Sequence, residues 1–76
     1  MKELLTYIAQ NLVDHPEQVV VTQRQGEGET LLELRVASED MGKVIGRQGR
    51  IAKWIRVLMR SVGQRQGTRV SVDITD

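Results

Sequence analysis

Two glycines three positions apart, with a cation between them, are the residues of this sequence best placed to bind a ligand. Gly46 and Gly49 flank Arg47 and Gln48 within the stretch GKVIGRQGRIAKWI, residues 42–55. A turn with glycine at both ends lets a ligand reach the backbone, and the N–H groups that open a following helix attract anions. Arg47 adds a cation, and Gln48 adds a donor and an acceptor. The loop therefore predicts contact with phosphate groups, and the apolar side chains beside it predict a shallow groove for bases.

Charge is unevenly divided along the chain. Residues 1–40 hold three cations and eight carboxylates, a net charge of −5, whereas residues 41–76 hold eight cations and two carboxylates, a net charge of +6. Such asymmetry favours a polyanionic partner. On a helical wheel, Lys53, Arg56 and Arg60 share one side of the segment after the loop. They form either a binding surface or an ordinary solvated helix face, and the sequence leaves both interpretations open.

The first half of the chain predicts a helix followed by a β-hairpin. Leucine and isoleucine at helical spacing predict a helix over residues 2–13, which ends before Pro16 because the residue before a proline is pushed out of the helical region. The β-branched run 19–22 predicts one strand. The alternation of apolar and charged residues over 32–36 predicts another, and residues 25–29 are the expected connector.

The second half predicts the elements that position the loop. Ser38 is expected to cap a short helix that ends at Gly46, with Glu39 and Asp40 complementing the helix dipole. A second helix is expected directly after the glycine loop. Its apolar stripe, expected to be buried, consists of Ile51, Ile55, Leu58 and Val62, with Trp54 and Met59 at its edges. Alternation over 70–75 predicts the last strand, which gives the order α-β-β-α-α-β.

The stretch from Val44 to Ile51 resembles the K-homology (KH) signature, in which hydrophobic-Ile-Gly-x-x-Gly-x-x-Ile joins two helices. The closing isoleucine stands one position early here. The resemblance extends beyond the loop, because MKELLTYIA, LVDHPEQV and ASEDMGKVIGRQGRIAKWIR are similar to the KhpA family of small bacterial proteins with one KH domain. Trp54 stands where this family leads us to expect a small residue.

The resemblance implies both a fold and a function. The implied fold is an α+β, type II KH domain over residues 1–76, with a three-stranded mixed sheet packed on one face by three helices. The implied function is non-catalytic binding of short single-stranded RNA through the GxxG loop and the adjacent apolar groove. A role as an RNA chaperone in the cytoplasm, in control of cell shape and cell-wall biogenesis, is implied as well. The implied partners are single-stranded RNA and a second KH chain, either in a homodimer or in a heterodimer with KhpB.

The predicted RNA-binding residues are Gly42, Ile45, Gly46, Arg47, Gln48, Gly49, Arg50, Ile51 and Lys53. The resemblance assigns the two loop glycines to the sugar-phosphate backbone, the two residues between them to phosphates, and the glycine and two isoleucines outside them to the groove. Arg50 and Lys53 are added from their charge and position. The connector 25–29 corresponds to the variable loop of the family, and its two glutamates are expected to weaken RNA contact.

Other classes of function have less support in the sequence. The chain has no cysteine, a single histidine and no G-x-x-x-x-G-K-[ST] phosphate loop, so we expect no catalysis, no metal and no cofactor. The N-terminal residues contain no apolar run long enough for a signal peptide or a membrane span, which favours a cytoplasmic protein. Two alternatives stay open: a helix-turn-helix protein whose second helix enters the major groove of DNA, and a protein-assembly module that binds no RNA.

Overall fold

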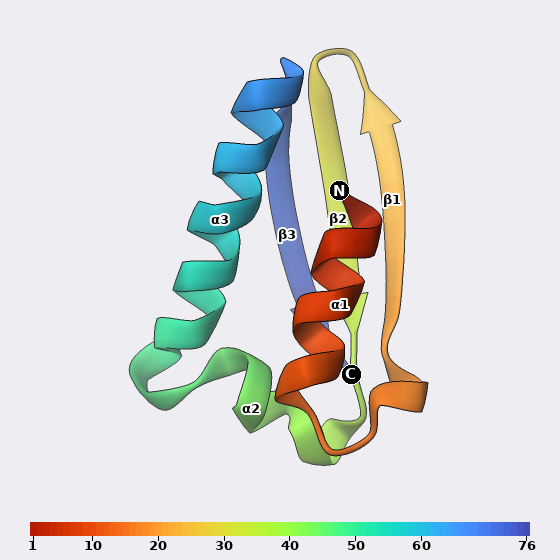
Figure 1. The fold of residues 1–76 in the computed structure, drawn as a ribbon, viewed down its shortest axis with the longest axis vertical. Helices are drawn as coiled ribbons and strands as arrows, with labels where there is room; N and C mark the ends of the chain where they lie inside the picture. The colour runs from red at the N-terminus through yellow and green to blue at the C-terminus, as the bar shows by residue number, and fades with distance from the viewer.

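The computed structural model describes residues 1–76, which form a sheet and a layer of helices (Figure 1). The helices are α1 (Lys2–Leu12), α2 (Met41–Ile45) and α3 (Arg50–Gln66), and the strands are β1 (Val20–Gly26), β2 (Glu29–Arg35) and β3 (Arg69–Thr75). Three short 3₁₀ turns join them, at Pro16–Gln18, Ser38–Asp40 and Arg47–Gly49. The predicted α+β class and element order are confirmed.

The sheet has the order β1-β2-β3, with β1 antiparallel and β3 parallel to β2. In Figure 1 the chain leaves the lower end of β2, rises in front of the sheet as α3, and returns to start β3 at the top. This crossover is right-handed, as expected for two parallel strands joined through helices. The predicted mixed sheet of three strands is confirmed.

The β1–β2 hairpin is tighter than predicted. Pairing continues without a break to Gly26 opposite Glu29, so only Glu27 and Gly28 form the turn. Gly28 has φ +68°, a left-handed conformation that glycine adopts without steric cost. The expected connector 25–29 is therefore mostly strand, because backbone pairing with β2 extends into polar residues that carry no strand pattern of their own.

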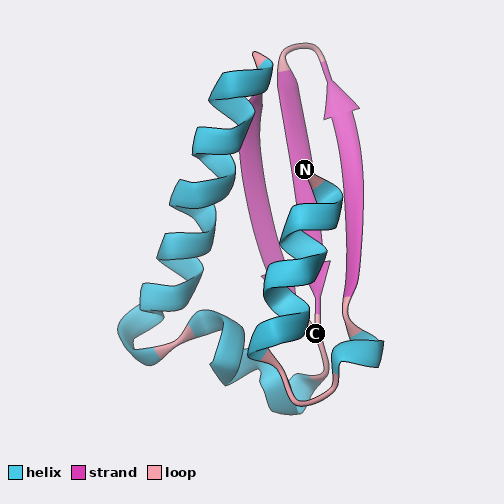
Figure 2. Cartoon of the chain, viewed as in Figure 1, coloured by secondary structure: helices cyan, strands magenta, loops and turns pink.

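The core lies between the sheet and the helices. Figure 2 shows α1 and α3 on the same side of the sheet, with α2 at the end of this layer. Side chains without exposed surface come from all of these elements and include Leu5, Ala9, Leu32, Leu34, Val44, Ile55 and Met59. In β2 the two buried leucines are two positions apart, as the alternation of side chains along a strand requires.

The longest helix, α3, is rotated relative to the predicted orientation, although Ile55 of the predicted stripe and Met59 at its edge are buried. Its buried residues are Ala52, Ile55, Met59 and Gly63. A Cβ on Gly63 would overlap the side chain of Val70 and lie 2.8 Å from the carbonyl oxygen of Thr68, so the missing side chain lets α3 pack closely on β3. The helix turns these small residues toward the sheet, and Ile51, Leu58 and Val62 of the predicted stripe are only half-buried.

Ser38 does not cap the short helix as predicted, and Asp40 binds the segment that follows α1. The Ser38 hydroxyl donates to Glu39, and no side chain caps α2. The Asp40 carboxylate has no exposed surface and accepts hydrogen bonds from the backbone N–H groups of Asp14 (3.2 Å) and His15 (2.9 Å). These bonds tie the segment that follows α1 to the start of α2.

Lys43 completes the cluster around Asp40. Its Nζ lies 2.9 Å from Asp14 Oδ2 and 3.8 Å from Asp40 Oδ1. Burial raises the pKa of Asp40, but the two backbone donors and the nearby charges outweigh this effect and hold the pKa below its ordinary value. The hydrogen bond with Asp14 raises the pKa of Lys43. Both shifts favour the charged forms of Asp40 and Lys43.

Candidate nucleic-acid interface

The glycine loop joins the end of α2 to the start of α3. Helix α2 ends at Gly46, whose φ of +78° is a conformation that side chains rarely adopt. The Gly46 N–H donates to the Gly42 carbonyl (2.9 Å) and closes the helix. A Cβ on Gly46 would lie 2.6 Å from Cγ1 of Ile51. The fold itself therefore requires glycine at this position, independently of any ligand.

Two consecutive residues of the loop have a left-handed backbone. Gln48 has φ +58° and Gly49 has φ +73°, and α3 begins directly after them. The Gly49 N–H donates to the Gly46 carbonyl (3.1 Å). No atom lies within 4 Å of a Cβ built on Gly49 or on Gly42. These two glycines leave bare backbone at the surface, where a sugar-phosphate chain can approach closely.

The start of α3 carries no negative charge. Its first turn has no acidic residue and no side-chain cap, so the positive end of the helix dipole is uncompensated. Arg50 Nη2 donates to Gln48 Oε1 (3.2 Å), which leaves the Gln48 NH₂ group to donate to a ligand. Arg47 is exposed beside it. Backbone, dipole and side chains together make the loop suited to anions.

The structure brings the predicted site residues into one continuous region. Gly42 and Ile45 lie on α2, the loop follows, and Arg50, Ile51 and Lys53 lie in the first turn of α3. The cations are exposed and the two isoleucines are half-buried. Neither of the two clefts in the structure lies at the loop. The surface beside the loop is therefore shallow, and it forms no pocket.

A second group of cations consists of Arg56 and Arg60, which the sequence already placed on one side of the helix, and of Arg69, which sequence reasoning missed. Arg56 Nε donates to the Val72 carbonyl (3.3 Å), so this flank of α3 faces the outer edge of β3. Arg60 and Arg69 line a cleft at the opposite end of α3 from the loop. The sequence does contain one signal for this group, since residues 41–72 include no carboxylate.

Metal-ligating side chains are dispersed over the structure. No group of three or more His, Cys, Asp or Glu side chains lies close enough to share a metal ion. None of the helices combines the length and the apolar composition needed to cross a membrane.

Comparison with known proteins gives a consistent result over the whole chain. The KhpA/KhpB KH-domain model matches residues 2–74. RNA-binding protein KhpA of Treponema pallidum is 51% identical over 75 residues, which cover 99% of this chain and 94% of that protein. The protein of the same name from Clostridium acetobutylicum is 53% identical over 74 residues, or 97% of this chain and 99% of that one. The one from Listeria monocytogenes is 45% identical over 76 residues, the full length of both. No solved structure matches the chain at a significant level.

Proposed function

Because the chain belongs to the KhpA/KhpB family of KH domains, we propose that it binds short single-stranded RNA through the loop Gly46–Gly49 and the shallow apolar surface beside it. One observation carries the assignment to this loop. Bare glycine backbone, an uncapped helix N-terminus and exposed cations meet there, in a part of the chain without carboxylates. A phosphate at the loop is stabilised by backbone N–H groups, by the helix dipole and by Arg47.

The preference for single strands follows from the shape of the surface beside the loop. Half-buried Ile45 and Ile51 offer an apolar floor on which unpaired bases can lie. A duplex keeps its bases stacked inside and cannot use such a floor. The helix-turn-helix alternative has less support, because a recognition helix needs polar side chains toward the base edges. Among the exposed positions of α3, Trp54 and Val57, each 53% exposed, offer no polar group to a base edge.

The finer roles in this proposal follow from weak and reversible binding. A single KH loop clamps about four nucleotides, and release between successive binding events is what an RNA chaperone requires. We propose no catalytic step. RNA of a bacterium is in its cytoplasm, so the proposal places the protein there. Control of cell shape and cell-wall biogenesis would follow through the transcripts that it binds.

The proposal includes a second KH chain as a protein partner, either a copy of this chain or KhpB. Exposed apolar side chains on one face of α3 favour such contact, because Trp54 and Val57 adjoin the half-buried Ile51 and Leu58. Apolar surface of this kind on a small domain commonly marks an interaction site. The assembly-module alternative shares this face, and RNA binding by the chain distinguishes the two.

The experiment that tests the loop replaces Arg47 and Gln48 together by aspartate. Surface substitutions shift stability by about 0.5 kcal/mol or less, so the melting temperature should stay nearly unchanged. The affinity for single-stranded RNA, measured by fluorescence anisotropy, should fall at least about tenfold, or about 1.4 kcal/mol, because repulsion replaces attraction at the phosphates.

A matched control changes the same two residue types at another place in the chain. Arg-Gln-Gly occurs at residues 24–26 as well as at 47–49. Replacing Arg24 and Gln25 by aspartate makes the same change of charge on β1, and RNA affinity should then be far less affected. A folded loop variant that binds RNA as tightly as the parent would remove the loop from the proposal. Equal losses in both variants would attribute binding to net charge alone.

A further inference from the structure

Among the cations of α3, only Arg56 is hydrogen-bonded to the sheet. Its Nε donates to the Val72 carbonyl, with 3.3 Å between the two atoms. The strand that carries Val72, β3, lies at an edge of the sheet and has β2 as its only neighbour. Arg69 and Thr75 form backbone hydrogen bonds with the residues that flank β2. Val72 lies three positions from each of them, so its carbonyl points to the open edge of β3, where Arg56 meets it.

The bond to Val72 leaves most donors of the Arg56 side chain free. A guanidinium group holds five N–H donors in one rigid plane, and the bond uses only the donor on Nε. The ion pairs that arginines form in this structure involve Arg24 and Arg69, so no carboxylate occupies Arg56. Because the hydrogen bond already restricts the side chain, a ligand loses less affinity to ordering it. Arg56 therefore presents an oriented pair of Nη groups that can only donate.

Arg56 lies close enough to the glycine loop to meet the same RNA. From Arg50, which directly follows the loop, the helix rises about 9 Å to Arg56. One KH loop holds about four nucleotides. No carboxylate lies between residues 41 and 72 to repel the strand on its way. A strand whose phosphates lie at the loop can therefore place one of its bases at Arg56.

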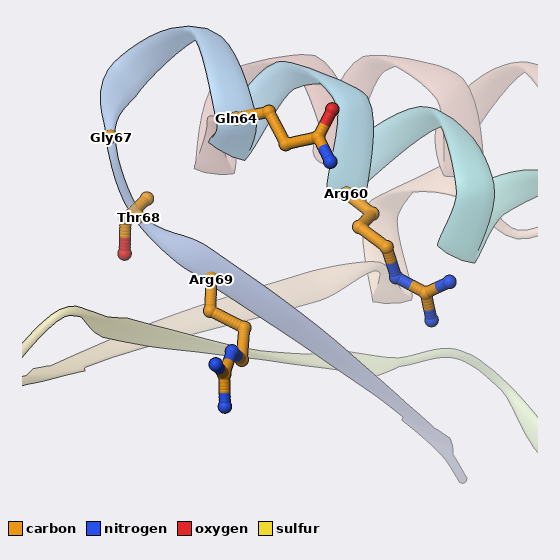
Figure 3. Close-up of a pocket in the computed structure, with 5 residues that line it drawn as sticks. All are labelled: Arg60, Gln64, Gly67, Thr68 and Arg69. Carbon is orange, nitrogen blue, oxygen red and sulfur yellow. The ribbon is translucent and has the colours of Figure 1, made fainter.

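The neighbouring cations of this flank are not held in the same way. Lys53 and Arg60 are exposed and contact no acceptor on the sheet. Figure 3 shows the Arg60 side chain extending from α3 clear of the other labelled side chains, with Arg69 on the opposite side of β3. Cations without a fixed orientation attract phosphates of any sequence. Reading a base edge requires an oriented donor pair, and Arg56 is the cation of this flank that has one.

From this arrangement we propose that Arg56 determines base specificity and selects a guanine in the bound RNA through the O6 and N7 atoms of that base. Two adjacent acceptors match the two donors of a guanidinium fork. Adenine presents an amino donor beside N7, and uracil presents the single acceptor O4 on this edge. Unpaired bases of a single strand leave the edge accessible. This inference rests on the proposed function, because the guanine belongs to the RNA held at the glycine loop.

The test moves a single guanosine through each position of a uridine strand of about six nucleotides, slightly longer than the footprint of one loop. Fluorescence anisotropy measures the affinity of each strand. At one position guanosine should raise the affinity of the parent about fivefold or more over the all-uridine strand. Adenosine at that position should bring no gain, and 7-deazaguanosine, which lacks the N7 acceptor, should lose most of the gain. A gain from cytidine equal to that from guanosine would overturn the assignment to guanine.

Two matched variants assign the preference to one side chain. Arg56→Lys keeps the charge and loses the planar fork, so it should bind the all-uridine strand like the parent and show no preference for guanosine. Arg60→Lys makes the same change one turn further along α3 and should keep the preference. No preference in the parent, a preference retained by Arg56→Lys, or an equal loss in Arg60→Lys would overturn the inference. A parent that binds no strand at all would overturn the proposed function, and the all-uridine strand distinguishes this result from the others.

Discussion

Gly42 lies in the helix before the loop, Gly49 is the last residue of the loop, and the two meet opposite backbone requirements. Gly42 has a helical backbone within α2, whereas Gly49 has φ +73°. A methyl group has open space at both positions. Gly42→Ala should therefore raise the free energy of unfolding by up to about 1 kcal/mol, since alanine favours helix. Gly49→Ala should lower it by about 1–2 kcal/mol, the cost of a left-handed conformation for an L-residue with a Cβ. Urea denaturation of the two variants measures both changes.

The same pair separates stability from binding. If Gly42 borders the RNA groove, its new methyl group occupies surface that the ligand needs, so a more stable protein should bind RNA less well. Gly46 is unsuited to this test, because the Ile51 side chain leaves no room for a Cβ at position 46. Unchanged RNA affinity of a stabilised Gly42→Ala variant would place Gly42 outside the site.

At the scale of elements, Asp40 joins the segment after α1 to the start of α2. Its pKa lies below the ordinary value when folded, so the carboxylate stabilises the fold above its unfolded pKa, and this stability is lost as pH falls through the folded pKa. Melting temperatures between neutral pH and about pH 3 should therefore fall steeply for the parent and less steeply for Asp40→Asn. Asp40→Asn should also melt lower than the parent at neutral pH. Equal acid slopes for the two proteins would contradict the role assigned to Asp40.

The order of helices and strands was predictable, because apolar residues recur at helical spacing in the helices and at every second position in the strands. The buried face of α3 was not, because Ala52 and Gly63 carry little hydrophobic signal, and only their small size lets α3 approach β3. Ser38 has the right type for a cap, but the 3₁₀ turn before α2 directs its hydroxyl to Glu39. The loop was predictable because its residues are contiguous. The cleft at the end of α3 was not predictable, since the residues that line it come together only through the turn between α3 and β3.

At the scale of the whole molecule, one small domain with a single loop offers few contacts to RNA. A single loop with about four nucleotides and few phosphate contacts gives a shallow dependence of affinity on salt, with a slope of about −1 to −3. Two linked chains bind one RNA with a raised effective concentration and need no new contact. The exposed apolar face of α3 is the surface available for such pairing, and the rotation of α3 on the sheet leaves it uncovered.

If the exposed α3 face pairs two chains, Trp54→Ala should disrupt that contact. Because Trp54 is 53% exposed, its loss should leave the melting temperature of the monomer nearly unchanged. Self-association, measured by sedimentation over a range of concentration, should weaken about tenfold or more, since a large aromatic side chain is a common anchor of interfaces. Affinity for long RNA should fall with it, while affinity for a four-nucleotide strand should not.

Two valines of equal exposure supply the matched control. Val57 on α3 is 53% exposed and Val20 on β1 is 54% exposed, but a strand residue on the sheet lies outside the α3 face. Val57→Ser should weaken self-association and Val20→Ser should not, although both remove the same side chain. If the parent sediments as a monomer at every concentration, self-association through this face is ruled out, and mixing with KhpB tests the other proposed partner. If Trp54→Ala associates like the parent with either partner, the α3 face has no part in assembly, and the weakness of a single loop must be offset by the length of RNA that one chain contacts.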